Sequence, residues 1–170
     1  SLPEAIWQSI FHAVSGFNSA GFTVLPEGTS LASVQKDKTI LGIMATLIVV
    51  GSISYWVMVD VVKKRRFSLL ALNTKLVLIL TTLLITLGTG VFFFSEYNND
   101  TLIDLDLSDK IIVSVFESIS GRTAGFSTVS HAETEQHTNF FFAAMMFIGG
   151  ASASVAGGIK VNTVAVVLVA

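Results

Sequence analysis

Two short strings of this chain have residue types that can bind a cation through the main chain. Asn18-Ser-Ala-Gly-Phe22 is followed about a hundred residues later by Arg122-Thr-Ala-Gly-Phe126. Glycine adopts backbone conformations that side chains forbid, so carbonyl oxygens beside it can turn to one side. A ring of such carbonyls can replace the water around a monovalent cation. Gly21 and Gly125 are therefore the first candidates for a binding site, and two ordinary turns that share Ala-Gly-Phe are the alternative.

The predicted ligands are main-chain carbonyl oxygens rather than side chains. They belong to Asn18, Ser19, Ala20, Gly21, Arg122, Thr123, Ala124 and Gly125. The charge of Arg122 would repel a cation, so we expect its guanidinium to point away and to bond carbonyls or a carboxylate behind the string. Glu117 is the predicted carboxylate, and with Phe22 and Phe126 we expect it to support the two strings.

The chain lacks the sequence patterns of an enzyme. Gly157-Gly-Ile-Lys160 has neither the spacing of a phosphate loop nor the Ser or Thr that must follow the lysine. No Gly-x-Ser-x-Gly elbow is found. The chain has no cysteine, and His12, His131 and His137 are scattered without the spacing of a zinc site. We therefore expect no enzymatic activity, and a net charge of -2 gives no reason to expect nucleic acid as a partner.

The composition indicates that lipid surrounds these strings. Hydrophobic residues make up 52% of the chain and charged residues 13%, with a mean hydropathy of +0.73. Three uncharged runs, 39–59, 76–95 and 138–159, are each near the roughly 20 residues that cross a bilayer. The core of a large soluble protein is the alternative, but too little polar sequence remains to cover three such runs. We predict an all-α integral membrane protein.

Each string follows a helix that is too short to span. Residues 3–17 and 109–120 are predicted to be helical for three or four turns, and to enter the membrane from outside and stop midway. Irregular backbone is tolerated at that depth only where it faces protein or a water-filled cavity. The C-terminal ends of the two helices would direct partial negative charge towards that cavity, which favours cations.

Charged residues predict the orientation of the chain. Lys63, Lys64, Arg65 and Arg66 follow the first run, whereas the connection after the second run is acidic, from Glu96 to Asp109. Basic residues concentrate on the cytoplasmic side, so both strings should face outside. The basic cluster is interpreted as a topology signal in a solvated loop, with a lipid-headgroup site as the alternative.

The third run should not form a continuous helix. Gly149, Gly150, Ala151, Ser152, Ala153, Ser154, Val155, Ala156, Gly157 and Gly158 lie within it. Each interior glycine costs a helix about 1 kcal/mol relative to alanine. We predict a break here, and a small-residue face for close helix packing is the alternative. Lys160 should pair with a carboxylate or carbonyls, or face water near the cytoplasmic side.

These motifs together resemble one transporter family. Residues 18–22, 121–126 and 146–160 are similar to the second and third filter regions of the Trk/Ktr/HKT potassium transporters, most of all to the bacterial Ktr-type membrane subunit. The resemblance implies helix, pore loop, helix repeats of the potassium-channel type, of which this chain would hold about two of four. Residues 1–66 would be the pore helix, filter and following helix of the second repeat. Residues 67–170 would be the third, with a transmembrane helix at 69–95, an outer loop at 96–108, a pore helix and filter at 109–127 and an interrupted helix at 138–170.

The resemblance also implies a function and partners. It predicts potassium uptake across the bacterial plasma membrane by a multi-pass protein, with K⁺ held at the filter carbonyls, and translocation is either passive or assisted by Na⁺ as a coupling ion. Residues 149–158 and Lys160 would form an intramembrane gate. The implied partners are the missing first and fourth repeats, a second copy of the subunit, a cytoplasmic nucleotide-binding regulatory subunit and membrane lipid. A sodium-selective or mixed transporter of the same family and a non-transporting membrane scaffold are the alternatives.

Overall fold

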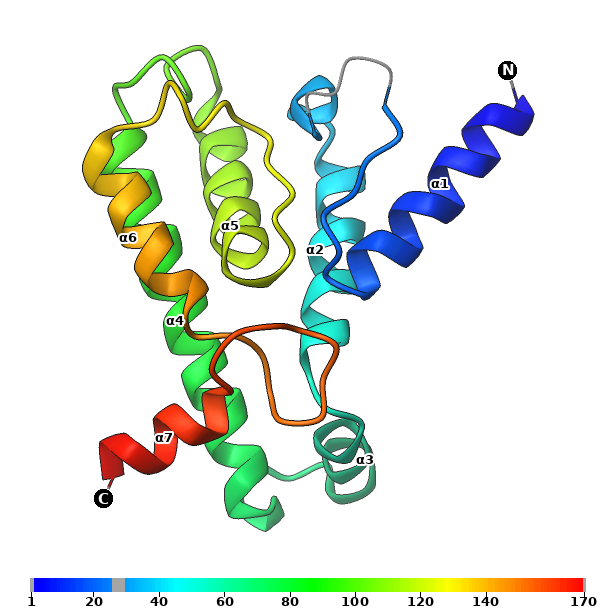
Figure 1. Ribbon diagram of the computed structural model, residues 1–170, viewed down its shortest axis with the longest axis vertical. Helices are drawn as coiled ribbons and strands as arrows, with labels where there is room; N and C mark the ends of the chain where they lie inside the picture. The colour runs from blue at the N-terminus through cyan, green and yellow to red at the C-terminus, as the bar shows by residue number, and fades with distance from the viewer. Residues whose placement is uncertain (1, 26–29, 170) are drawn as a thin grey trace.

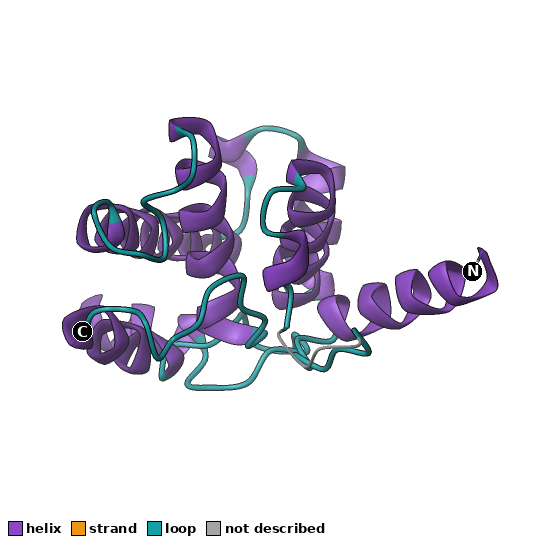
Figure 2. Cartoon of the chain, turned by 90° about the horizontal axis from the view of Figure 1, so that it is seen from above, coloured by secondary structure: helices purple, strands orange, loops and turns teal. Residues whose placement is uncertain are grey.

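The chain folds into helices joined by turns and loops. A computed structural model describes residues 2–25 and 30–169. Within this part the α-helices are α1 (Leu2–Phe17), α2 (Lys38–Ser52), α3 (Tyr55–Lys64), α4 (Leu72–Glu96), α5 (Leu107–Thr123), α6 (Gln136–Met146) and α7 (Val161–Val169), with single 3-10 turns η1 (Ala32–Val34) and η2 (Phe67–Leu69). The described residues form no named strand (Figures 1 and 2), so the predicted all-α class is confirmed.

The two predicted short helices are found. The helix predicted at 3–17 is α1, and the helix predicted at 109–120 is α5, which begins two residues earlier and continues for three more. Each is followed by irregular backbone and then by a helix, α2 after α1 and α6 after α5 (Figure 1). The sequence repeat is therefore also a repeat of structure.

Helix α4 runs along the length of the molecule (Figure 1). Among the described residues it alone is long and apolar enough to cross a membrane as one helix. Its 25 residues correspond to about 37 Å at 1.5 Å per residue. The run predicted at 76–95 lies inside α4 and is helical throughout.

The run predicted at 39–59 is not one straight helix. Helix α2 ends at Ser52, and the axis of α3 is bent by 100° from that of α2. Ile53 and Ser54 are extended, and the Ser54 hydroxyl accepts a hydrogen bond from the Val57 N–H, which caps α3. The prediction of one helix was wrong here. An uncharged run can lie in lipid whether or not it is a single helix, and whether the helix is unbroken depends on capping residues and on tertiary contacts.

The run predicted at 138–159 is also broken, in this case as expected. Helix α6 ends at Met146, and residues 147–160 form a loop before α7 begins. Both helices that follow a string are thus interrupted, α2 at residues 53–54 and α6 at the glycine-rich segment.

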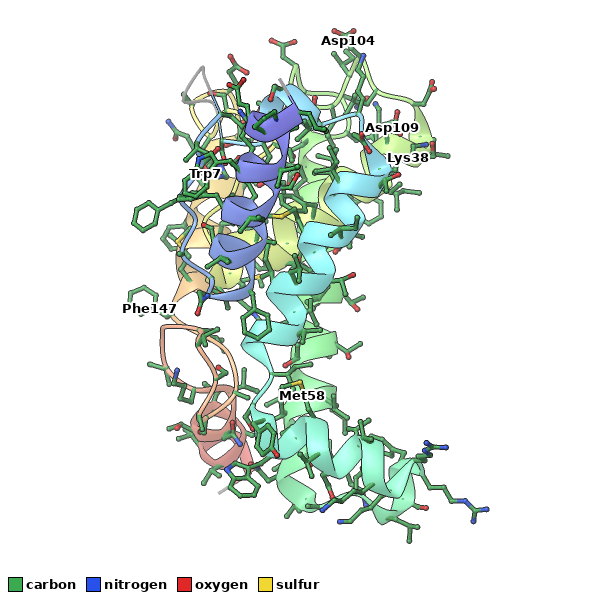
Figure 3. The ribbon with its side chains drawn as sticks, turned by 90° about the vertical axis from the view of Figure 1, so that its right-hand side faces the viewer. Trp7, Lys38, Met58, Asp104, Asp109 and Phe147 are labelled. Atoms are coloured by element: carbon green, nitrogen blue, oxygen red, sulfur yellow. The ribbon has the colours of Figure 1, made fainter. Side chains whose placement is uncertain are left out.

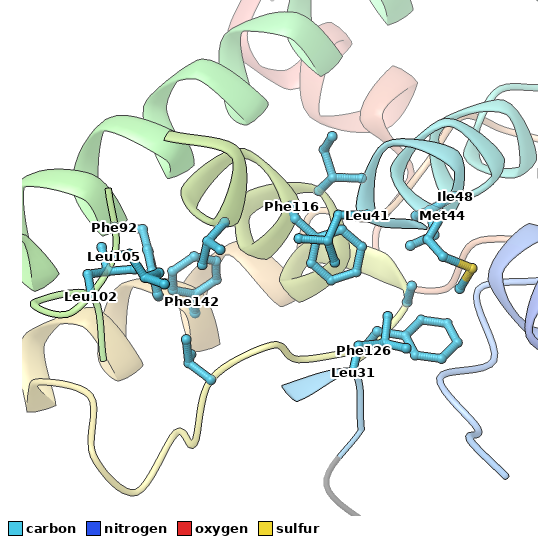
Figure 4. Close-up of a cluster of buried hydrophobic side chains, with 14 residues drawn as sticks. Leu31, Leu41, Met44, Ile48, Phe92, Leu102, Leu105, Phe116, Phe126 and Phe142 are labelled. Carbon is cyan, nitrogen blue, oxygen red and sulfur yellow. The ribbon is translucent and has the colours of Figure 1, made fainter. Parts of the chain in front are cut away.

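The hydrophobic core lies around α5, which packs between α2, α4 and α6 (Figure 4). Phe92 of α4 and Phe142 of α6 meet edge to face with ring centroids 5.8 Å apart. Gly88 allows α4 to approach α5, because a Cβ atom there would lie 2.3 Å from the Ser118 hydroxyl oxygen. That hydroxyl donates to the Ile85 carbonyl at 2.8 Å. These contacts fix the height of α5 and therefore of the string that follows it.

Charged side chains separate towards the two ends of the molecule. Lys38, at the start of α2, pairs with Asp109 of α5 at 2.9 Å, and both lie with Asp104 at one end (Figure 3). Met58 of α3 lies towards the opposite end, where the chain also carries its basic cluster at residues 63–66 (Figure 3).

Candidate functional site

The two glycines of the repeated strings have the same unusual backbone conformation. Gly21 has φ +72° and Gly125 has φ +77°. This left-handed region is costly for residues with a Cβ atom, by about 1–2 kcal/mol. The positions therefore require glycine for a conformational reason, as the sequence suggested.

The fold brings the two strings into contact. A Cβ atom built on Gly21 would lie 2.3 Å from the Ala124 carbonyl oxygen and 3.5 Å from the Gly125 carbonyl carbon. The strings thus form adjoining walls of one surface. At Gly125 a Cβ atom would have no neighbour within 4 Å, so the constraint there is the backbone conformation alone.

Equivalent hydrogen bonds hold both strings to their helices. The Ser15 hydroxyl donates to the Phe22 carbonyl at 2.9 Å, and the Ser120 hydroxyl donates to the Phe126 carbonyl at 2.7 Å. The backbone N–H groups of Ala20 and Ala124 donate to the carbonyls of the same serines at 2.9 and 2.8 Å. Sequence reasoning missed these serines, although Ser-Gly is repeated at 15–16 and 120–121 and could have indicated them.

The carbonyls predicted as ligands are unpaired in the described part of the chain, whereas those of Phe22 and Phe126 accept hydrogen bonds. None of the carbonyl oxygens of residues 18–21 or 122–125 accepts a hydrogen bond from the described residues. Asn18, Ala20 and Gly125 are exposed, and Ser19, Gly21 and Thr123 are half-buried, so these carbonyls remain available to water or to a cation. The structure thus leaves unpaired the carbonyls that the sequence singled out.

Arg122 does not pair as predicted. It is buried, and its Nε and Nη1 atoms have no hydrogen-bond partner among the described residues. Glu117 instead binds the segment after the string: its Oε1 accepts the Thr128 N–H at 2.5 Å and the Thr128 hydroxyl at 2.7 Å. Residues five apart on a helix of 3.6 residues per turn lie on different faces, so the predicted pairing of Glu117 with Arg122 is wrong in this structure.

His12 occupies the position of Glu117 in the first repeat and makes a similar contact. Its Nε2 lies 2.9 Å from the Thr23 hydroxyl oxygen, and its Nδ1 lies 2.7 Å from the Gln8 carbonyl oxygen. Because a carbonyl only accepts, Nδ1 carries a hydrogen, and Nε2 of the neutral ring accepts from Thr23. Each repeat thus uses one helix residue to hold the chain just beyond its glycine.

The glycine-rich segment forms a closed loop. The N–H of Gly149 donates to the Ile159 carbonyl at 2.9 Å, and the N–H of Ile159 donates to the Phe147 carbonyl at 2.8 Å. A Cβ atom on Gly149 would lie 1.5 Å from the Gly157 carbonyl oxygen, so the two sides of the loop touch only because no side chain intervenes. Lys160 donates to the Ala156 carbonyl, one of the partners expected for it.

The loop is anchored on the C-terminal end of α2. The N–H of Ala151 donates to the Ser52 carbonyl at 3.0 Å, and the N–H of Val155 donates to the Gly51 carbonyl at 3.4 Å. These carbonyls would otherwise be unpaired where α2 stops. Gly150 permits the approach, because a Cβ atom there would lie 2.7 Å from the Ser52 carbonyl oxygen. The break in one repeat is therefore the docking point for the loop of the other.

The string of the second repeat and the glycine-rich loop face one cavity. It has a volume of about 270 Å³ and is lined by residues 121–125, Met146, Gly157 and Gly158. No group of three or more His, Asp or Glu side chains in the described residues could hold a metal ion. The lining includes residues 122–125, whose carbonyl oxygens are unpaired, and also Arg122, whose Nε and Nη1 atoms have no hydrogen-bond partner among the described residues.

Glu96 is a buried residue that the sequence analysis placed in the acidic outer loop. It is the last residue of α4, and its carboxylate accepts from Thr101 at 2.9 Å, Thr138 at 2.6 Å and the Glu135 N–H at 3.0 Å. Glu135 and Thr138 belong to the start of α6, so this carboxylate joins α4 to α6. The sequence signal that could have indicated its burial is that Glu96 directly follows the uncharged run 76–95.

Comparisons with known proteins agree with this architecture. A family model described as TrkH, cation transport protein, matches residues 3–169. The Ktr system potassium uptake protein B of Bacillus subtilis (strain 168) is 39% identical over 166 residues, covering 97% of this chain and 37% of that protein. The potassium/sodium uptake protein NtpJ of Enterococcus hirae is 32% identical over 166 residues, covering 98% of this chain and 36% of that protein. The chain thus spans little more than a third of these relatives.

A solved structure shares the fold. The crystal structure of the potassium transporter TrkH from Vibrio parahaemolyticus matches with a TM-score of 0.77 and 18% identity, covering 95% of this chain and 34% of the other. At that identity the match supports the arrangement of helices and loops.

Proposed function

This chain belongs to the TrkH family of cation transport proteins, and we propose that it forms two neighbouring walls of a potassium uptake pathway across the bacterial plasma membrane. The observation that carries the proposal is the pair of left-handed glycines in contact across the repeat, flanked by carbonyls without hydrogen-bond partners. The filter ligands are the carbonyl oxygens of residues 18–21 and 122–125. No bond is made or broken, so the activity is transport rather than catalysis.

The glycine-rich loop is the proposed gate. It lines the same cavity as residues 121–125, so an ion that leaves the filter on that side meets Gly157 and Gly158. It lies outside the α-helices and about half of its residues are exposed, which is typical of segments that open locally. Lys160 is the last residue of the loop, and its ammonium group donates a hydrogen bond to the Ala156 carbonyl within the loop.

The rest of the pore comes from elsewhere in the protein. Two strings form only part of a ring, and the face of α1 that carries Leu2, Ile6, Trp7, Ile10 and Val14 is exposed. In the second repeat α4 covers the corresponding side of α5. We propose that residues 1–66 and 67–170 are the second and third of four repeats, and that the first and fourth complete the ring. A second subunit and a cytoplasmic nucleotide-binding subunit that acts on the inner face are proposed from the family resemblance.

A mixed or sodium-selective pathway is the second candidate. One relative is named a potassium/sodium uptake protein, and a carbonyl filter with a single glycine in each loop can serve either ion. A pathway that admits sodium would also allow sodium to act as a coupling ion. Competition between the two ions distinguishes these cases, because a potassium-selective filter keeps its rubidium uptake in a large excess of sodium.

The test uses the full-length parent protein in cells that lack their own potassium uptake. Rubidium and potassium uptake are compared for the native protein and Gly125→Ser, with Gly42→Ser as the matched control. Gly42 lies in α2, where a Cβ atom would meet nothing within 4 Å and the backbone is ordinary helix. We expect Gly125→Ser to lose apparent potassium affinity, or selectivity over sodium, at unchanged membrane abundance.

Unchanged uptake by Gly125→Ser would contradict the filter assignment. The scaffold alternative predicts this result, together with a site that water-soluble reagents cannot reach from outside. Accessibility of a cysteine introduced at Thr123 to such a reagent separates the two, because a pathway must be wet and a packed scaffold is dry.

A further inference from the structure

The basic cluster is part of a rigid corner rather than a free loop. Helix α3 ends at Lys64, and Arg65 closes it with φ +52°. Asp60 of α3 accepts the Ala71 N–H at 2.8 Å through one oxygen and pairs with Lys64 at 2.7 Å through the other. Ala71 precedes the first residue of α4, so the carboxylate of Asp60 ties the end of α3 to the start of α4.

Three basic side chains of this corner are left without partners. Lys63, Arg65 and Arg66 are exposed and make no ion pair or side-chain hydrogen bond with the described residues. Lys75 lies nearby, where it donates to the Ser68 carbonyl at 2.9 Å and sits over the Phe67 ring. The corner therefore presents concentrated positive charge on a backbone that Asp60 holds in place.

Apolar side chains lie beside these charges. Phe67, Leu69 and Leu72 are 54%, 59% and 73% exposed, and they occupy η2 and the first position of α4. On α4 the exposed apolar surface continues through Ile79, Leu83 and Leu87, which share a helix face with Leu72 because they follow it by 7, 11 and 15 residues. The corner thus joins a basic edge to an apolar stripe.

The depth of this corner follows from α4. A helix of about 37 Å exceeds the roughly 30 Å hydrocarbon core, so Leu72 and Glu96 lie near opposite interfaces. Helix α3 turns by 100° from α2 and runs across the long axis of the molecule (Figure 3). It begins with the exposed Tyr55 and Trp56, residues enriched at the level of lipid headgroups.

We propose that Lys63, Arg65 and Arg66, together with the apolar side chains of η2, bind an anionic phospholipid of the cytoplasmic leaflet. The phosphate and glycerol headgroup lies against the three cations, and the acyl chains lie against Phe67, Leu69 and Leu72. The continuity of this apolar surface with the exposed stripe of α4 favours a lipid over a soluble protein partner, whose surface would have to end where the stripe continues. The proposal does not depend on the transport function.

The test measures the affinity of the purified full-length parent, in neutral detergent, for a fluorescent short-chain phosphatidylglycerol. The same measurement is made with phosphatidylcholine as competitor. The variant K63Q/R65Q/R66Q removes the charges, and K63R/R65K/R66K retains them as the matched control. Each basic residue near an anionic surface contributes about 1 kcal/mol, so we expect the first variant to bind at least tenfold more weakly and the control to bind within about twofold of the native protein.

Three outcomes would overturn the proposal. The first is native lipid affinity in the charge-removed variant, and loss of binding to the cytoplasmic subunit by that variant would then assign the surface to a protein. The second is competition by phosphatidylcholine as strong as by phosphatidylglycerol. The third is complete competition by millimolar inorganic phosphate, which would indicate a site for free anions. Equal yield and a single gel-filtration peak for both variants exclude misfolding, and separate rubidium uptake assays show whether transport itself is intact.

Discussion

Gly21 lies directly against Ala124, so that a Cβ atom at position 21 would approach the Ala124 carbonyl oxygen to 2.3 Å. These residues are more than a hundred positions apart in the chain and belong to different copies of the repeat. Their contact means that the two strings cannot move independently. It also makes the two glycines unequal, because Gly21 is constrained by contact and by conformation, and Gly125 by conformation alone.

This inequality gives the first prediction. Gly21→Ala should reduce rubidium uptake more than Gly125→Ala, because the second change costs only the left-handed strain of about 1–2 kcal/mol. Initial uptake rates and the thermal unfolding midpoint of the full-length protein measure both effects. Gly42→Ala, a helical position with open space around it, should have little effect on either. Equal losses for Gly21→Ala and Gly125→Ala would show that the contact with Ala124 is absent in the whole protein.

The second prediction concerns Glu117. Because its carboxylate bonds Thr128 and not Arg122, Glu117→Gln and Thr128→Val should be coupled in a double-mutant cycle by about 0.5–3 kcal/mol. Glu117→Gln and Arg122→Gln should be additive within about 0.5 kcal/mol. The free energy of unfolding of the full-length protein is the readout. Strong coupling to Arg122 with none to Thr128 would restore the pairing expected from the sequence.

The third prediction concerns the anchor of the glycine-rich loop. Gly150→Ala should loosen the loop from α2, since its methyl group would meet the Ser52 carbonyl oxygen and the Ala156 side chain, each at 2.7 Å. If the loop obstructs the pathway, the maximal rate of rubidium uptake rises. Gly157→Ala adds the same methyl group to the same loop where nothing lies within 4 Å, and should leave the loop in place. A lower or unchanged rate in Gly150→Ala would argue against the gate.

The fourth prediction separates buried from exposed carboxylates at the outer end. Glu96→Gln replaces an acceptor of several hydrogen bonds by a group that also donates, and should destabilise the protein by about 1–3 kcal/mol. Asp104→Asn, at an exposed position of the same acidic connection, should change stability by less than about 0.5 kcal/mol. Thermal unfolding of both variants gives the comparison. Similar midpoints would mean that the Glu96 hydrogen bonds are replaced by water.

Much of the fold could be predicted because it depends on local chemistry and on solvent. Low charge indicated lipid, the length of residues 76–95 indicated a spanning helix, and clustered glycines predicted the end of α6. The bend between α2 and α3 was missed because the hydropathy of an apolar run does not distinguish one continuous helix from two helices joined by a bend. Its break is stabilised by the Ser54 cap and by the loop from residues 147–160, and that loop is distant in sequence.

The sequence by itself determined that positions 21 and 125 can take a left-handed backbone without strain, because glycine has no Cβ atom, although Ser19, Arg65 and Ala153 also have a positive φ in the structure. It also determined the repeat and the distribution of charge along the chain. The tertiary structure alone decided that Gly21 contacts Ala124, that Glu117 bonds Thr128 rather than Arg122, and that the loop docks on Ser52. Such pairings depend on where rigid helices place side chains in three dimensions, and residue spacing along the chain does not specify them.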